Sequence, residues 1–152
     1  MGCYYYNGDH GLTQYRANAL ELWNRAAELG NASSHYNIGY AYRHGNGVEQ
    51  DRKKAKHYWE LAAMRGDVQA RHNLGCIEGQ AGNHDRASKH FMIAAGLGNN
   101  RSLETIKRMF MNGDATKDDY AKALRVYQAC LVEIKSPQRD EAAAFDDDYK
   151  YY

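Results

Sequence analysis

The sequence is poor in proline and cysteine, carries almost no net charge, and has no long apolar run. Its 152 residues contain one proline, so long helices are permitted over most of the chain. Twenty lysines and arginines stand against 19 aspartates and glutamates, which leaves no excess charge to hold a polyanion or an anionic membrane. The longest apolar stretch, near residues 91–97, is far shorter than the ~20 residues of a membrane span. These absences favour a globular helical protein that does not act at a membrane.

Cysteine is scarce and badly placed for cross-linking. The three cysteines, Cys3, Cys76 and Cys130, are an odd number at wide spacing, which fits neither a disulfide framework nor a zinc knuckle. We interpret them as reduced thiols that act mainly as small packing residues. Residues 1–4 include no basic or apolar segment of secretory type. We therefore expect an intracellular, reducing location.

The sequence does contain a repeat, with a period of about 36 residues. Trp23 recurs as Trp59, and the same step relates Gly30 to Gly66 and Gly39 to Gly75. Shorter matches recur around Phe91 and around Tyr127. A period of this length is typical of stacked helical repeats, so we divide the chain into copies at about 1–30, 31–66, 67–98 and 99–135.

Each period has the pattern of two helices. In the second copy, Ile38 and Tyr42 are four residues apart in the first helix, and Trp59 lies on an apolar stripe with three alanines in the second helix. Glycine followed by Asn or Asp marks each junction between copies, where the glycine ends one helix and the polar side chain caps the next. The pattern places small residues such as Gly39 beside the bulky Trp59, and it predicts hairpins that stack because none buries its apolar side alone.

The two ends of the chain differ from the middle. The first copy starts inside its first helix, and we predict a loop at Gly8–Gly11 before its second helix. At the other end, Ser136 and Pro137 predict a helix start, so that residues 136–145 form a short terminal cap. We interpret residues 146–152, which are acidic and aromatic, as a frayed tail. Residues 1–145 then make a single domain.

The second copy resembles a known family. Residues 36–48, followed by Asp51, Lys54-Ala55, Trp59 and Ala62-Ala63, are similar to the Sel-one-like repeat (SLR), a relative of the tetratricopeptide repeat with a longer loop between its helices. The resemblance covers roughly residues 1–131, and it departs from the pattern at Glu78 and Lys107. It implies an all-α, right-handed superhelix, or solenoid, that acts as an adaptor for peptides or proteins.

The same resemblance suggests that the first helix of each copy lines a concave groove. The side chains that face it are then Tyr36, Tyr40, Arg43 and His44 in the second copy, Gln69, His72 and Cys76 in the third, and Arg101 and Arg108 in the fourth. Tyrosine and arginine often anchor interfaces, and arginine binds carboxylates in a fork. We expect a protein or peptide partner with acidic character, although some of these tyrosines could pack between repeats instead. We also expect self-association through the incomplete first repeat.

The sequence offers little evidence of a catalytic or metal-binding site. The sequence has no G-x-S-x-G elbow, no phosphate loop and no H-E-x-x-H. S-x-x-K, which matters because some relatives of the SLR family have been proposed to be β-lactamases, is also absent. His72 and Cys76 lie one helical turn apart, but zinc needs three or four ligands. We therefore assign no catalytic residue, no metal and no cofactor.

Nucleic acid is the alternative partner. Residues 43–71 hold seven basic residues against four acidic ones, mostly on the second helix of the copy. That helix lies on the convex side of a solenoid, where charge usually only keeps the surface soluble. We therefore favour a peptide over RNA as the ligand, and salt-sensitive RNA binding would distinguish the two.

Overall fold

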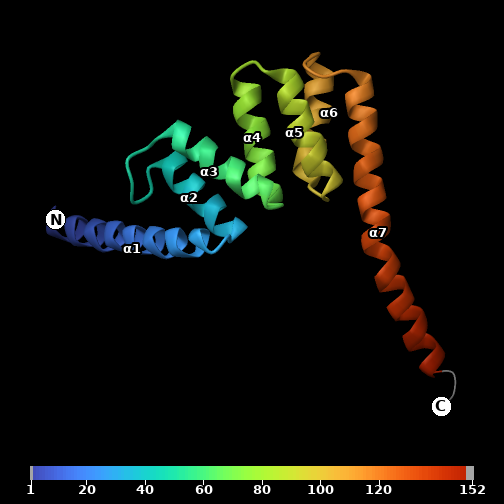
Figure 1. Ribbon diagram of the computed structural model, residues 1–152, viewed down its shortest axis with the longest axis horizontal. Helices are drawn as coiled ribbons and strands as arrows, with labels where there is room; N and C mark the ends of the chain where they lie inside the picture. The colour runs from blue at the N-terminus through green and yellow to red at the C-terminus, as the bar shows by residue number, and fades with distance from the viewer. Residues whose placement is uncertain (1, 150–152) are drawn as a thin grey trace. The chain divides into compact units, whose positions relative to one another are not determined.

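The computed structural model describes the backbone of residues 2–149 and the side chains of residues 14–135 and 137. These residues form seven α-helices and no strand, which confirms the predicted all-α class (Figure 1). The helices are α1 (Gly2–Glu28), α2 (Ala32–His44), α3 (Arg52–Met64), α4 (Val68–Gln80), α5 (His84–Gly96), α6 (Asn100–Asn112) and α7 (Lys117–Tyr149). They belong to two compact units, residues 1–81 and residues 82–152.

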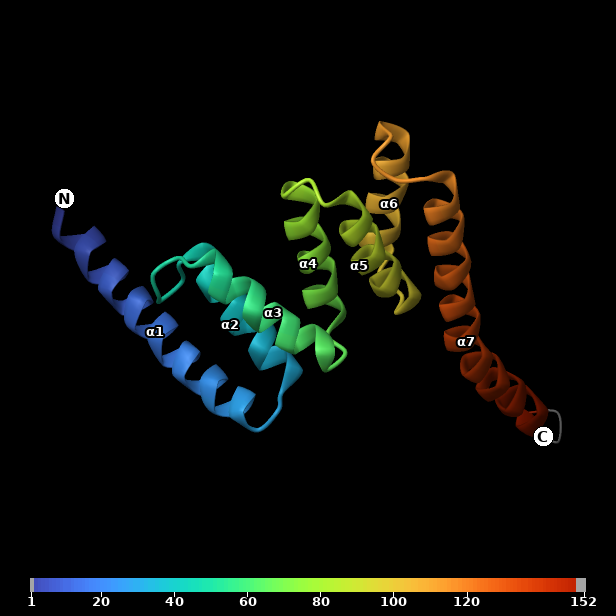
Figure 2. The ribbon, with the colours of Figure 1, turned by 45° about the horizontal axis from the view of Figure 1, so that its top comes forward.

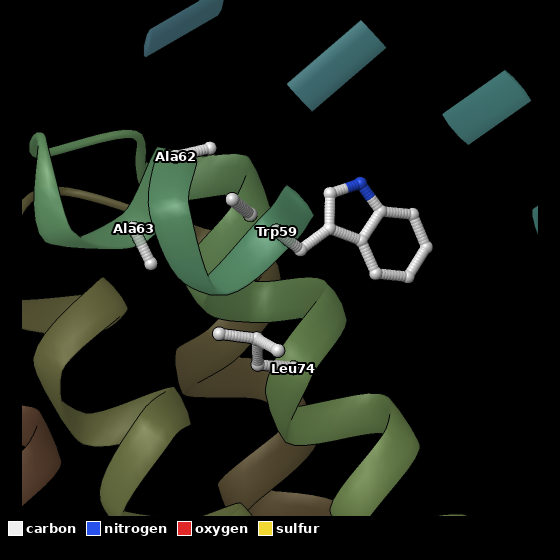
Figure 3. Packing of buried hydrophobic residues seen from close by; sticks show 5 residues of the cluster. Trp59, Ala62, Ala63 and Leu74 are labelled. Carbon is white, nitrogen blue, oxygen red and sulfur yellow. The ribbon is translucent and has the colours of Figure 1, made fainter. Parts of the chain in front are cut away.

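In the first unit, each helix packs against the next one along the chain, α1 on α2, α2 on α3 and α3 on α4 (Figure 2). Its core cluster consists of Trp59, Ala62, Ala63, Ala70 and Leu74, and Tyr36 and Ile77 pack against it. Figure 3 shows Trp59, Ala62 and Ala63 on α3 above Leu74 on α4. The alanines let the two helices approach closely, while the indole fills the remaining space.

The second unit is built from α5, α6 and α7, each of which packs against the other two. Phe91 on α5, Ile106 on α6 and Ala123 on α7 are all buried in it. Ile106 and Ile38, which are equivalent in the repeat, are both fully buried. The apolar stripes predicted from the period are therefore the packed faces of the helices in both units.

The junctions between the copies have the predicted chemistry. Gly30, Gly66 and Gly98 all have positive φ angles of 85–90°, which end the preceding helices. In each case the next residue caps the following helix through its side-chain oxygen. Asn31, Asp67 and Asn99 accept from the amides of Ser34, Ala70 and Ser102, each over 2.8 Å.

The first copy differs from the prediction. α1 is one helix from Gly2 to Glu28, so the loop expected at Gly8–Gly11 does not form. A glycine inside a helix costs about 1 kcal/mol, whereas each further residue of a nucleated helix adds a hydrogen bond. Two glycines therefore do not end a helix that packs against α2 over its later turns. The predicted self-association through this repeat depends on side chains before residue 14, which lie outside the described ones.

The C-terminal cap is also corrected. α7 is one helix from Lys117 to Tyr149, with Pro137 inside it, so residues 136–145 do not form a separate helix. A proline within a helix removes one hydrogen bond and bends the axis, but it does not have to end the helix. Figure 1 shows α7 changing direction along its length. The frayed tail predicted for residues 146–152 is helical up to Tyr149, and the remainder lies outside the described residues.

None of the described helices is long and apolar enough to cross a membrane.

Candidate interaction surface

The C-terminal end of α2 carries three of the predicted groove residues on one face. Tyr40, Arg43 and His44 are three and four residues apart, a spacing that brings side chains together on a helix. Tyr40 is 45% exposed, and its ring centroid lies 4.2 Å from that of His44. The helix ends at Gly45, whose φ is 68° and whose N–H donates to the carbonyl of Ala41. This end of α2 therefore presents an aromatic pair and a guanidinium to the solvent.

Arg43 also lines a cavity of about 240 Å³, together with Arg52, Ile77, Gln80 and Ala81. The cavity thus joins the end of α2, the start of α3 and the end of α4. Ile77 packs against the core cluster around Trp59, so the apolar wall of the cavity continues into the core. Two guanidiniums beside an apolar wall suit a ligand that is both anionic and partly apolar.

Arg52 was not among the predicted site residues, because its sequence position places it in a basic run on a second helix. The loop after α2 folds back, and the amide of Asp51 donates to the carbonyl of Tyr42 over 2.9 Å. The side-chain amide of Gln50 also donates to the carbonyl of Arg43, again over 2.9 Å. These bonds bring the start of α3 to the end of α2. No pattern in the sequence predicts these two hydrogen bonds.

Tyr36 has a different surrounding from Tyr40. It is half-buried, and its ring stacks on that of Trp59 with centroids 6.4 Å apart. The indole Nε1–H of Trp59 donates to the backbone carbonyl of Tyr36 over 3.2 Å. The alternative of packing tyrosines, left open by the sequence, therefore describes the position of Tyr36 well.

On α4 the predicted residues divide between surface and interior. Gln69 is exposed, whereas His72 is 4% exposed and Cys76 is half-buried. The placement of His72 on an open groove is therefore corrected, because its side chain is buried. Cys76 Sγ lies 3.6 Å from His72 Nε2. Among the described residues, no group of three or more His, Cys, Asp or Glu side chains gathers as a metal site would require.

Arg101 and Arg108 are exposed on α6, in the second compact unit. Thr105 lies between them: its hydroxyl donates to the carbonyl of Arg101 over 2.8 Å and accepts from Arg108 over 3.5 Å. The structure thus brings Tyr40, Arg43 and His44 together, and it places these two arginines on a separate unit.

The basic run over residues 43–71 is partly used within the protein. Lys54 Nζ lies 5.2 Å from the ring centroid of Tyr42, and Lys56 Nζ lies 2.9 Å from the carboxylate of Glu78. Arg71 donates to the carbonyl of Ala63. Of these three contacts, only the ion pair with Glu78 offsets a positive charge, so the basic run by itself neither favours nor excludes a nucleic-acid partner.

Comparison with known proteins identifies similar sequences and folds. The family model described as Sel1 repeat matches residues 1–31 and 32–67. A Sel1 repeat protein from Oxalobacter formigenes is 26% identical, with a TM-score of 0.61 over 75% of this chain and 49% of that one. The protein c5321, a protective antigen of uropathogenic Escherichia coli that displays an SLR fold, is 28% identical, with a TM-score of 0.60 over 71% of this chain and 25% of that one. This chain therefore spans about half of the first structure and a quarter of the second. No curated protein sequence matches significantly.

Proposed function

Because this chain belongs to the Sel1 repeat family and has the all-α repeat-solenoid fold, we propose that it is a non-catalytic scaffold that binds a peptide or protein segment. The observation that carries the proposal is the exposed aromatic pair of Tyr40 and His44 beside Arg43 at the end of α2. Tyrosine and arginine contribute large contact areas together with directional hydrogen bonds, which is why they dominate the energetics of many interfaces.

The surface is also suited to binding at low entropic cost. α2 is held by a cap at each end, at Asn31 and at Gly45, and its buried face packs on α3. Side chains on a fixed helix lose little freedom when a ligand arrives, so more of the contact energy is retained as affinity. Gln69 on α4, and Arg101 and Arg108 on α6, are the other exposed members of the proposed binding set.

The proposal is tested by selecting binders from a phage library of random 12-residue peptides and measuring their affinity by fluorescence anisotropy. We expect the double substitution Tyr40→Ala and His44→Ala to lower the affinity for the selected peptides by about tenfold or more. Tyr15→Ala is the matched control, since Tyr15 is 72% exposed on α1 and lies outside the proposed surface. Selected peptides that bind the Tyr40/His44 variant as well as the original protein would overturn the proposal.

RNA is tested in the same assay with a labelled 12-nucleotide poly(U). A peptide surface predicts weak binding of this probe and little competition with the selected peptides. Tight, steeply salt-dependent RNA binding that is lost with Lys53→Gln and Arg52→Gln would instead favour the nucleic-acid alternative.

A further inference from the structure

Two arginines share one small cavity, and no acidic side chain lines it. The lining consists of Arg43, Arg52, Ile77, Gln80 and Ala81. Within the described part of the chain, neither guanidinium takes part in an ion pair. Asp51, which precedes Arg52, is already used as the cap of α3, where its carboxylate accepts from two backbone amides at 3.0 Å. The cavity therefore holds two positive charges without an internal counter-ion.

The two arginines are held in place by the backbone that carries them. Arg43 lies on the last turn of α2, and its carbonyl accepts from the side chain of Gln50. Arg52 is the first residue of α3, and the amide just before it, that of Asp51, is bonded to α2 through the carbonyl of Tyr42. The relative position of the two stems is fixed before any ligand binds, which favours a fork-like contact with one anion.

The size and the wall of the cavity limit what fits. At about 240 Å³ it lies below the ~300–1,000 Å³ of pockets for drug-sized molecules, so it accommodates one or two side chains. Ile77 and Ala81 offer apolar surface beside the arginines, and Gln80 offers an amide. A nucleic-acid backbone would leave the apolar wall unused. An acidic side chain next to an apolar one would use both parts of the cavity.

We propose that this cavity binds the carboxylate of an Asp or Glu side chain within a partner segment, with a neighbouring apolar side chain of that segment against Ile77. The inference rests on the proposed function and names the chemistry of its partner. An acidic side chain inside a segment fits better than a chain end, because Arg43 shares its helix face with the exposed Tyr40 and His44. The part of the partner segment that lies outside the cavity would then contact Tyr40 and His44 on this face of α2.

The test uses the same random 12-residue peptide library, selected in parallel on the original protein and on a variant with Arg43→Gln and Arg52→Gln. We expect peptides specific to the original protein to be enriched in an acidic residue beside an apolar one. In the best of these, changing the acidic residue to its amide should lower the affinity by about tenfold. Arg43→Gln or Arg52→Gln in the protein should lower the affinity for the original peptide by the same factor. Combining either substitution with the amide peptide should cause no further loss of affinity. Arg65→Gln, an exposed arginine of the same unit that does not line the cavity, is the matched control.

The outcomes separate this inference from the proposed function. Peptides that need Tyr40 but bind equally well without Arg43 and Arg52 overturn the inference and leave the proposed function standing. Peptides that lose affinity when their free C-terminus is amidated, and not when an internal acid is replaced, overturn the side-chain assignment. Binding of poly(U) that depends on the same two arginines also overturns it. Because Arg43 is half-buried, the melting temperatures of the Arg43→Gln and Arg52→Gln variants are measured too, and unchanged values exclude loss of fold as the cause of any effect.

Discussion

A Cβ atom placed on Gly39 would lie 2.5 Å from Cδ1 and 2.6 Å from Nε1 of Trp59, so the indole occupies the space that a side chain at position 39 needs. Trp59 is only 3% exposed, and its Nε1–H is engaged with the carbonyl of Tyr36. The indole therefore cannot move away from position 39 without losing this hydrogen bond and its contacts with the core side chains. Glycine at position 39 is what lets α2 and α3 approach to this distance.

Gly39→Ala should consequently lower the free energy of unfolding by about 1–3 kcal/mol, the usual cost of adding a carbon to a packed core. This loss exceeds the ~0.5–1 kcal/mol that alanine normally gains over glycine in a helix. Urea denaturation followed by circular dichroism and by tryptophan fluorescence, to which both Trp23 and Trp59 contribute, measures the change. A variant as stable as the original protein would show that the indole moves aside freely.

Gly96→Ala is the matched control for this prediction. A Cβ at position 96 would meet the side chain of Val126 at 3.6 Å, which is an ordinary van der Waals contact. This substitution in α5 should leave the free energy of unfolding unchanged or raise it by up to about 1 kcal/mol. The contrast in sign between the two glycines isolates the effect of the neighbouring ring.

A second prediction concerns the ion pair between Lys56 and Glu78, which joins α3 to α4. The two charged atoms are 2.9 Å apart, and the side chain of Glu78 is only 6% exposed while that of Lys56 is 39% exposed. Lys56→Met keeps the length of the side chain but leaves a buried carboxylate without this cation. We expect the free energy of unfolding to fall by about 2 kcal/mol, less than the ~3–5 kcal/mol of a fully buried pair.

The control is the pair of Arg25 and Glu21 on α1, whose side chains are 73% and 65% exposed over a similar distance of 2.8 Å. Arg25→Met should change the free energy of unfolding by no more than about 1 kcal/mol, because water screens this pair. Equal effects of the two substitutions would mean that burial of Glu78 does not matter.

A third prediction separates the two tyrosines of α2. Tyr36 stacks on Trp59 and packs on the core cluster, so Tyr36→Ala should reduce the free energy of unfolding by about 2 kcal/mol. Tyr40 is 45% exposed, so Tyr40→Ala should change the free energy of unfolding by no more than about 0.5 kcal/mol. The same substitution should lower the affinity for the selected peptides. Thermal denaturation and peptide anisotropy, measured on both variants, provide the comparison. The assignment is wrong if Tyr40→Ala destabilises the protein as much as Tyr36→Ala does.

The features that could be predicted from the sequence depend on short-range chemistry. Glycine followed by Asn or Asp at each junction specifies both the end of one helix and the cap of the next, and all three caps form as expected. The pairing of Gly39 with Trp59 follows from the period, since a small residue and a large one recur at matching positions. The all-α class follows from the same signals.

Other features depend on tertiary packing and on the path of a loop, which the sequence pattern does not reveal. Gly8 and Pro137 are local helix breakers, yet both lie inside helices. An interior glycine costs only about 1 kcal/mol, and an interior proline bends a helix without having to end it. The resemblance places His72 on the groove face of its helix, but α4 buries this side chain together with that of Glu78. Arg52 joins Arg43 only because the loop folds back through Asp51.

The start of α7 gives a prediction on pH. Asp119 accepts from the hydroxyl of Thr116 over 2.7 Å and from its amide over 3.0 Å, and the Asp119 amide donates back to the Thr116 hydroxyl over 3.1 Å. This reciprocal arrangement is a capping box. The side-chain hydrogen bond from Thr116, followed by the backbone one, holds the pKa of Asp119 below its ordinary value.

A carboxyl group whose pKa is lowered by folding stabilises the folded state when it is ionised. The contribution of Asp119 should therefore be fully present above about pH 4, the ordinary pKa of an aspartate, and it should be lost as the pH falls through the lower pKa of the folded state. Asp119→Asn removes the charge at every pH. The difference in free energy of unfolding between the original protein and this variant should be constant from pH 7 to about pH 5 and should shrink below pH 4.

Urea denaturation of both proteins between pH 2.5 and pH 7 measures this difference, with each point taken as original minus variant so that other titrating groups cancel. Asp118→Asn is the matched control, because Asp118 is the neighbouring acid in the first turn of α7 and its carboxylate pairs with Lys122 over 2.8 Å instead of with the cap. Thr116→Val should abolish most of the pH dependence attributed to Asp119, because it removes the hydroxyl that contributes most to the lowered pKa. A difference that grows as the pH falls below 4 would have the opposite sign from the one that this capping box requires.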